Sequence, residues 1–99
     1  EEDLTMATYL VMGKLLEKGI NNLEKTVASG DRFISKGKEY GVEVRELMWL
    51  TGDYDVCCIL SAESDQAIGS LLFKAASKGY IKTSSFKAFP YDEVQKAVG

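Results

Sequence analysis

The chain contains no histidine, and this absence excludes several classes of site. A Ser-His-Asp triad, a Cys-His pair, an imidazole metal ligand and a proximal haem ligand all require that residue. The only two cysteines, Cys57 and Cys58, are adjacent, which excludes a four-thiolate zinc site and a disulfide framework. We therefore expect no metal and no cofactor. Two unpaired thiols also favour a reducing compartment, and we predict a cytoplasmic protein.

Long hydrophobic runs are missing as well. The longest, such as residues 56–60, fall far below the roughly 20 residues that a membrane-spanning helix needs. The lysines and arginines are scattered without a basic stripe. We therefore expect neither a membrane nor a nucleic acid as a partner. A 99-residue chain holds one domain that buries only about two-thirds of its unfolded surface, so self-association is an obvious supplement to its stability.

The acidic excess is confined to the first residues. Residues 1–4 (EEDL) resemble the tail of the myc epitope tag, and Met6 is a plausible native start after Thr5. We interpret residues 1–5 as a tag remnant and residues 6–99 as one domain; a native acidic N-terminus is the alternative. Without the three acidic residues of the tag, 12 acidic and 12 basic residues remain, so the net charge of -3 carries no functional meaning.

Hydrophobic periodicity and turn residues predict the order of the elements. Strands are expected over 7–14, 42–51, 54–62 and 81–89, and helices between Gly19 and Gly41, from Ser64 to Lys78 and over 92–98. Ile20, Leu23, Val27 and Ile34 would share one face of the first helix, which 29–31 could interrupt. The order β-α-β-β-α-β is typical of a ferredoxin-like α+β fold, a four-stranded antiparallel sheet with two helices on one face.

Strict alternation assigns the strand residues to two faces. Val42, Val44, Met48 and Leu50 would face the helices, and Glu46 in the same register would be a candidate general acid or base if it were buried. The opposite face would carry Arg45, Leu47, Trp49, Cys57 and Ile59, with Phe86 or its neighbours from the fourth strand. That face is too apolar to remain solvated. We expect a second copy of the chain to cover it sheet to sheet, which would enclose a partly polar cavity.

A tight turn at 52–53 is expected to join the two central strands, and the sequence around it resembles a known family. The segment 49–56 (WLTGDYDV), together with Tyr9-Leu10-Val11, Gly19-Ile20, Gly41 and 86–89 (FKAF), resembles the GYD domain family over about residues 6–90. The naming residues match Gly52, Tyr54 and Asp55. The resemblance implies the dimeric α/β-barrel superfamily, which also holds effector-binding domains of Lrp/AsnC regulators and small monooxygenases and isomerases. The GYD family has no assigned biochemical activity, so the resemblance implies none for this chain.

Five residues are candidates for ligand binding: Arg45, Trp49, Tyr54, Asp55 and Cys57. Arg45 could hold a carboxylate while Trp49 stacks on the ligand, or both could anchor an interface. Tyr54 and Asp55 could line a pocket mouth, or they could simply satisfy the needs of a tight turn, which is the interpretation we favour. Cys57 is expected at the interface. The residues indicate no metal ligands, and they identify no catalytic residue.

Three functions are compatible with these residues. The first is a homo-oligomeric module that binds a small metabolite in a cavity between subunits. The second is a cofactor-independent monooxygenase or isomerase of the dimeric α/β-barrel type. The third is a structural oligomer without a ligand. Proton abstraction needs a tuned base, and the absence of histidine leaves few candidates, which favours a non-enzymatic role.

Overall fold

The computed structural model describes residues 6–99, and the predicted tag remnant, residues 1–5, lies outside the described part. The elements follow in the order β1 (Ala7–Leu15), α1 (Glu17–Ile20), α2 (Leu23–Ala28), α3 (Gly30–Glu39), β2 (Val42–Trp49), β3 (Val56–Ala62), α4 (Asp65–Ala76), β4 (Ile81–Ala88) and α5 (Tyr91–Val98). The predicted element order is therefore confirmed, with the first predicted helix divided into three.

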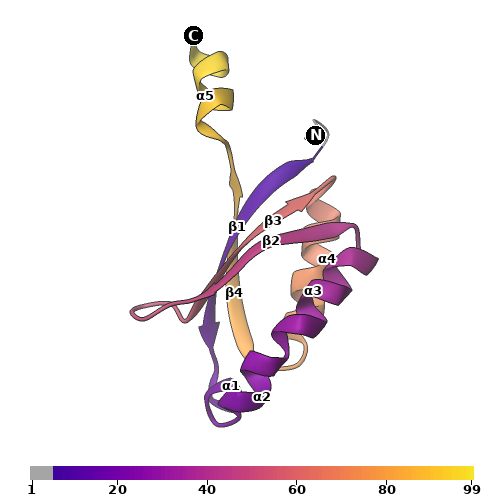
Figure 1. Ribbon diagram of the computed structural model, residues 1–99, viewed down its shortest axis with the longest axis vertical. Helices are drawn as coiled ribbons and strands as arrows, with labels where there is room; N and C mark the ends of the chain where they lie inside the picture. Colours follow the sequence, from indigo (N-terminus) through magenta and orange to yellow (C-terminus); the bar gives the residue numbers. More distant parts are fainter. Residues whose placement is uncertain (1–5) are drawn as a thin grey trace.

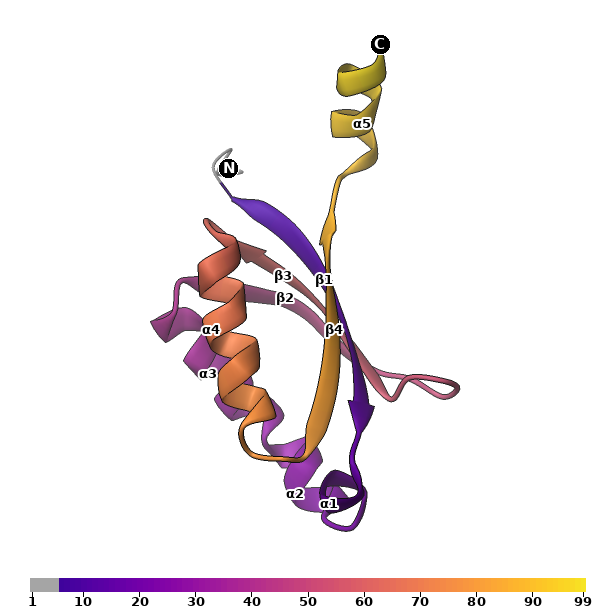
Figure 2. The same cartoon turned by 180° about the vertical axis from the view of Figure 1, so that it is seen from behind.

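One antiparallel sheet, in the order β2-β3-β1-β4, organises the fold. Because β3 lies between β1 and β2, and β1 lies between β3 and β4, each helical connection returns to a parallel strand two positions away. Figures 1 and 2 show α3 and α4 side by side on one side of this sheet. The chain thus has the predicted ferredoxin-like α+β fold. Within residues 6–99, no helix lies over the other face, which we call the uncovered face.

The helical segment after β1 packs differently from the prediction. Of the four residues expected on its buried side, Ile20, Leu23 and Val27 are exposed, so that prediction is wrong. Instead, Phe33 and Tyr40 of the α3 region pack on the core. Gly37 brings the helix close to the sheet, since a Cβ there would lie 2.9 Å from the carbonyl oxygen of Val42. The helix breaks change the phase of the apolar pattern, which explains the error.

Helix α4 matches its prediction closely. The Ser64 hydroxyl accepts a hydrogen bond from the backbone N–H of Ala67 at 3.1 Å and caps the first turn. Ile68, Leu71 and Leu72 are buried against the sheet. Gly79 follows the helix with φ +77°, a conformation that favours glycine. Local sequence signals were sufficient here because start, apolar stripe and stop belong to one unbroken helix.

The hairpin between β2 and β3 is wider than predicted. The two strands end and begin at Trp49 and Val56, so the connection comprises residues 50–55 rather than 52–53 alone. The backbone N–H of Leu50 donates to the carbonyl oxygen of Asp55 at 2.8 Å and closes this loop, and Gly52 supplies a φ of +130°. In Figures 1 and 2 the loop projects well beyond the rest of the sheet. The predicted two-residue turn is therefore wrong.

The C-terminal helix α5 stands apart from the body of the molecule (Figure 1). Pro90 precedes it, and all of its residues are exposed. Tyr91, Val94 and Val98 lie at intervals of three and four residues, so they share one side of the helix. A single chain thus leaves an apolar helix face unburied.

Candidate functional site

A β-bulge at Arg45 decides which residues of β2 face the helices. Val44 is paired with Leu60, whereas Glu46 is already paired with Ile59, so Arg45 is an extra residue in β2. An extra residue shifts the alternation of side chains by one position. Beyond the bulge, residues that regular alternation assigns to one face therefore lie on the other.

The shift moves Leu47 and Trp49 to the helix side of the sheet. Leu47 pairs with Cys58 and packs on the core, and Trp49 pairs with Val56. The prediction that these two residues share the face of Cys57 is wrong. Glu46 and Met48 take their place on the uncovered face, where Glu46 is exposed. The condition for a buried acid or base at Glu46 is therefore not met.

The uncovered face carries an apolar cluster that crosses all four strands. Strand pairing brings together Leu10, Met12, Met48, Cys57, Ile59 and Phe86. Phe86 is 52% exposed, and Arg45 lies at the side of the cluster, where its Nη1 donates to the Ser61 hydroxyl at 3.5 Å. The pairing confirms the predicted positions of Cys57 and Ile59 on this face and identifies Phe86 as the residue of β4 that joins them, and the hydrogen bond to Ser61 places Arg45 there as well.

The hairpin residues Tyr54 and Asp55 have different surroundings. Tyr54 is exposed, whereas the Asp55 carboxylate accepts a hydrogen bond from the backbone N–H of Leu15 at 2.8 Å. The backbone N–H of Asp55 also donates to the carbonyl oxygen of Gly13 at 2.9 Å. Asp55 therefore ties the hairpin to the end of β1, as the turn interpretation expects.

Replacing Asp55 with alanine should lower the free energy of unfolding by about 1–2 kcal/mol, because the N–H of Leu15 loses its acceptor in a partly buried position. Asp55→Asn keeps an acceptor oxygen and should recover most of this loss. Urea unfolding curves measure the effect, with Asp53→Ala in the same loop as the control. Equal losses for the alanine variants at 53 and 55 would contradict the assigned role.

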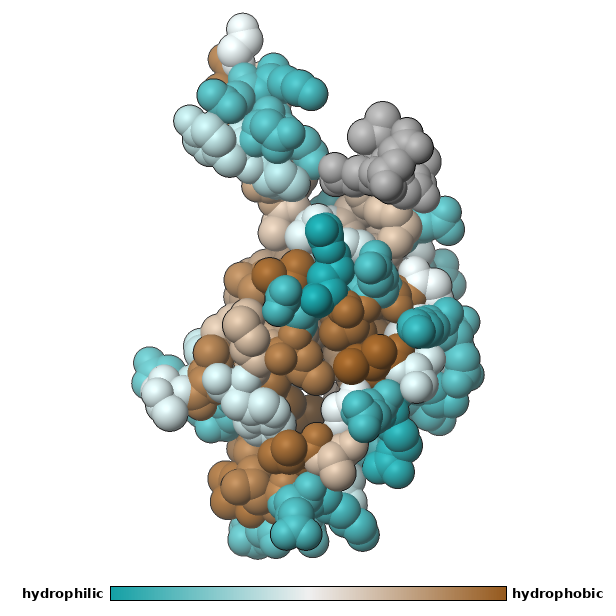
Figure 3. Space-filling view, in the orientation of Figure 1, coloured by the Kyte–Doolittle hydropathy of each residue, from teal (hydrophilic) through white to brown (hydrophobic). Residues whose placement is uncertain are grey.

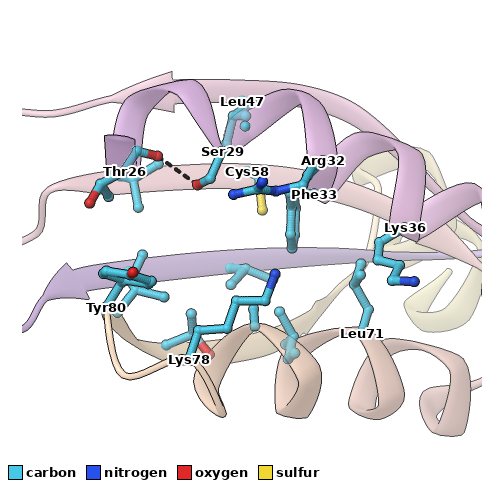
Figure 4. A pocket seen from close by; sticks show the side chains of 18 of the residues that line it. Thr26, Ser29, Arg32, Phe33, Lys36, Leu47, Cys58, Leu71, Lys78 and Tyr80 are labelled. Atoms are coloured by element: carbon cyan, nitrogen blue, oxygen red, sulfur yellow. Dashed lines mark hydrogen bonds between the residues drawn. The ribbon is translucent and has the colours of Figure 1, made fainter. Parts of the chain in front are cut away.

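A cavity of about 540 Å³ lies between the helices and the covered face of the sheet. Figure 4 shows α3 on one side, α4 and the turn after it on the other, and the strands as the floor. The floor and walls are apolar and include Val11, Phe33, Leu47, Trp49, Val56, Cys58, Leu71 and Leu72. Its volume is typical of small-molecule sites. In Figure 3, hydrophobic side chains gather in the middle of the molecule beside the hydrophilic surface of α3.

The rim of the cavity is rich in cationic groups. Lys25, Arg32, Lys36, Lys74 and Lys78 line it, and Glu39 is the one acidic residue among the lining residues. Lys36 Nζ lies 3.4 Å from Glu39 Oε1, and within residues 6–99 the other four cations form no ion pair. In Figure 4, Arg32 and Lys36 extend from α3, and Lys78 extends from the opposite side into the gap.

Two hydroxyl groups near the rim are already hydrogen-bonded to the backbone. The Ser29 hydroxyl donates to the carbonyl oxygen of Thr26 at 2.6 Å, and the Thr26 hydroxyl donates to the carbonyl oxygen of Gly19 at 2.9 Å. Both side chains stabilise the bends around α2. Ser35, Tyr80 and Thr83 add further hydroxyl groups to the lining, and the cationic side chains are its main charged groups available to a bound molecule.

Two ionisable groups next to the core hold their protons tightly. Burial raises the pKa of the Cys58 thiol to about 12, with a smaller contribution from Cys57. Burial, a hydrogen bond to the Asp65 carboxylate and the charge of Asp65 together raise the pKa of Tyr9 to about 12. A thiol with this pKa is protonated at neutral pH and is a poor nucleophile. Cys58 therefore contributes to the cavity as an apolar wall.

The described residues contain neither a metal cluster nor a membrane span. Among residues 6–99, no three histidine, cysteine, aspartate or glutamate residues are grouped so that they could bind a metal ion. No helix in the same range has the length and hydropathy needed to cross a bilayer.

The structure thus distributes the five predicted ligand-binding residues over three places. Arg45 and Cys57 lie on the uncovered face, Tyr54 and Asp55 in the hairpin, and Trp49 at the cavity, which Cys57 also lines in part. Sequence reasoning missed the cavity residues of α3. The available signal was the spacing of Gly30, Phe33 and Gly37, which predicts a close helix–sheet contact, together with Arg32 and Lys36 four residues apart on one side of that helix.

Comparison with known proteins supports the fold and identifies the family. The crystal structure of MtbAldR (Rv2779c) superposes with a TM-score of 0.62 at 10% sequence identity, over 86% of this chain and 54% of that one. The chain therefore spans about half the length of this structural relative, and the similarity concerns the fold alone. No curated protein sequence matches. The family model of the GYD domain matches residues 9–98. The chain belongs to the GYD domain family.

Proposed function

We propose that the chain is a homo-oligomeric binding module that pairs through its uncovered face and holds a small molecule. The observation that carries the proposal is the apolar cluster on the uncovered face. Leu10, Met48 and Phe86 of this cluster are exposed, and exposed apolar residues gathered on one face of a sheet are costly in water and typical of an interface. A second copy is the natural cover, because face-to-face sheets pack about 10 Å apart with interdigitating side chains.

Two further observations support self-association. Helix α5 leaves Tyr91, Val94 and Val98 exposed on one side, which gives a second apolar surface that one chain does not bury. Membership of the GYD family also implies the dimeric α/β-barrel superfamily, in which chains pair through their sheets. The surrounding charges favour a specific arrangement, since Arg45, Glu43 and Glu46 flank the apolar cluster on β2.

The small-molecule part of the proposal rests on the cavity beneath the helices. Of the five predicted ligand-binding residues, only Arg45 and Cys57 lie on the face where the two sheets would pair. The cavity, by contrast, offers about 540 Å³ of largely apolar space within each chain. The proposal includes neither a nucleic acid nor a membrane as partner, because the lysines and arginines are scattered along the sequence without a basic stripe. Cys57 and Cys58 are both free, which supports a reducing compartment and a cytoplasmic location.

Phe86→Lys should weaken self-association at least about 30-fold, because a charged group would replace an aromatic anchor in the paired sheets. Phe73→Lys is the matched control: it makes the same chemical change on α4, at an aromatic residue that is 77% exposed and lies away from the uncovered face. Light scattering after size-exclusion chromatography measures the masses. The proposal fails if both variants keep the oligomer of the unmodified chain, or if the unmodified chain is a monomer.

A further inference from the structure

The cavity beneath the helices has chemical features that select a class of ligand. Its floor is formed by side chains of the sheet, α3 and α4 that are almost entirely hydrocarbon. In the part of the chain that the structure describes, no buried side-chain nitrogen or oxygen lacks a hydrogen-bond partner. Thr83 of β4 is the polar side chain of the sheet that lines this space, and the other sheet residues of the lining are apolar, so the inner part of a well-matched ligand must be largely apolar.

The rim of the cavity, unlike its apolar floor, favours a negatively charged group. Five cationic side chains border the mouth against one carboxylate, and that carboxylate is paired with Lys36. Residues 6–99 as a whole carry equal numbers of acidic and basic residues, so this concentration of positive charge is local. Lys25, Arg32, Lys74 and Lys78 are exposed at this mouth, and an anion bound there would be attracted by several positive charges at once.

Arg32 and Lys78 are placed to hold the charged group of a ligand. They come from opposite walls, α3 and the turn after α4, and both line the opening (Figure 4). Arginine offers two parallel N–H donors to a carboxylate, and lysine adds a mobile point charge. The hydroxyls of Thr26 and Ser29 are bonded to backbone carbonyls and do not compete for the anion.

We infer that the cavity binds a small amphipathic anion, with an apolar body against the sheet and a carboxylate-type head group between Arg32 and Lys78. The inference rests on the small-molecule part of the proposed function and names its ligand class. Self-association takes place on the other face of the sheet, so the two properties can be tested separately.

Trp49 provides an internal reporter of binding, because it is the single tryptophan of the chain and lines the cavity. Octanoate and octanamide are suitable probes, since they share the same chain and differ mainly in the charge of an isosteric head group. Titration of the full chain with octanoate should shift the Trp49 emission to shorter wavelength. Its affinity should exceed that of octanamide at least about tenfold, as expected for charge-assisted hydrogen bonds.

Variants assign the selectivity to the rim. Arg32→Gln combined with Lys78→Gln should weaken octanoate binding at least about tenfold and leave octanamide binding unchanged. Lys38→Gln is the matched control, because Lys38 lies on α3 and does not line the cavity. Circular dichroism of each variant, which should match the unmodified chain, establishes that the fold is retained.

The outcomes separate the inference from the proposed function. Equal affinity for octanoate and octanamide would overturn the inference and leave a neutral apolar binding site standing. Equal weakening by the Lys38 and the Arg32/Lys78 variants would also overturn it, because the effect would then reflect overall charge. If neither probe changes the Trp49 emission, both the inference and the small-molecule part of the proposed function fail.

Discussion

Gly19→Ala is expected to destabilise the protein by about 3 kcal/mol or more. A Cβ at Gly19 would lie 2.2 Å from the carbonyl oxygen of Tyr80, a distance that no side chain can occupy without movement of the backbone. The same oxygen accepts a hydrogen bond from the N–H of Leu16 at 2.9 Å, so displacement would also weaken the junction between β1 and β4. Thermal unfolding followed by circular dichroism measures the loss.

The matched control is the same substitution at Gly69, in the middle of α4. There a Cβ would lie 3.8 Å from the Phe73 ring, an ordinary contact, and alanine has the higher helix propensity. Gly69→Ala should therefore stabilise the chain by about 0.5–1 kcal/mol. Opposite signs for the two glycine variants are the prediction, and a neutral Gly19→Ala would contradict the close approach of α1 to Tyr80.

Leu60→Ala should cost about 2–5 kcal/mol, because Leu60 is fully buried at the centre of the core. Its strand partners are Tyr9 and Val44, and their side chains lie on the same covered face. In a domain of this size, each kcal/mol lost lowers the midpoint of thermal unfolding by about 4–8 °C, so this midpoint should fall by at least about 8 °C.

Leu23→Ala serves as the control for Leu60→Ala, because Leu23 lies on α2 and is half exposed. Hydrophobic periodicity predicts Leu23 on the buried side of the first helix, so the pair also tests the observed break between α1 and α2. A loss at Leu23 as large as that at Leu60 would show that α2 packs on the core, contrary to the structure.

The element order could be predicted because the signals that define it are local. The cap at Ser64, the glycines at 41 and 79, and the apolar stripe of α4 each act within a few residues. The element order in turn predicted a ferredoxin-like sheet, which the strand order confirms. Those features do not depend on how distant strands are aligned.

The faces of β2 could not be predicted beyond Val44. Alternation assumes regular pairing, and the bulge at Arg45 depends on how β2 aligns with β3, which no local residue pattern revealed. Because of this one extra residue, Met48 and Glu46 lie on the uncovered face in place of the predicted Trp49 and Leu47. The uncovered face is nevertheless apolar as predicted, because Met48 replaced one apolar residue by another and Leu10, Met12 and Ile59 belong to β1 and β3.

The cavity was not predicted for a related reason. Its rim combines side chains from α2 and α3 with side chains from α4 and the turn after it, which lie far from α2 and α3 in the sequence. Because residues 6–99 carry equal numbers of acidic and basic residues, the composition gave no sign that five cationic side chains meet around one cavity. Scattered lysines become a local positive field only when the fold places them around one apolar space.

The most direct test of the central claim is the mass of the unmodified chain in solution. Sedimentation equilibrium of residues 1–99 between about 1 and 100 μM covers the range of moderately stable dimers. The uncovered face predicts a species of at least twice the 10.9 kDa of one chain. A single species of 10.9 kDa throughout that range would contradict the claim that a second copy covers the sheet.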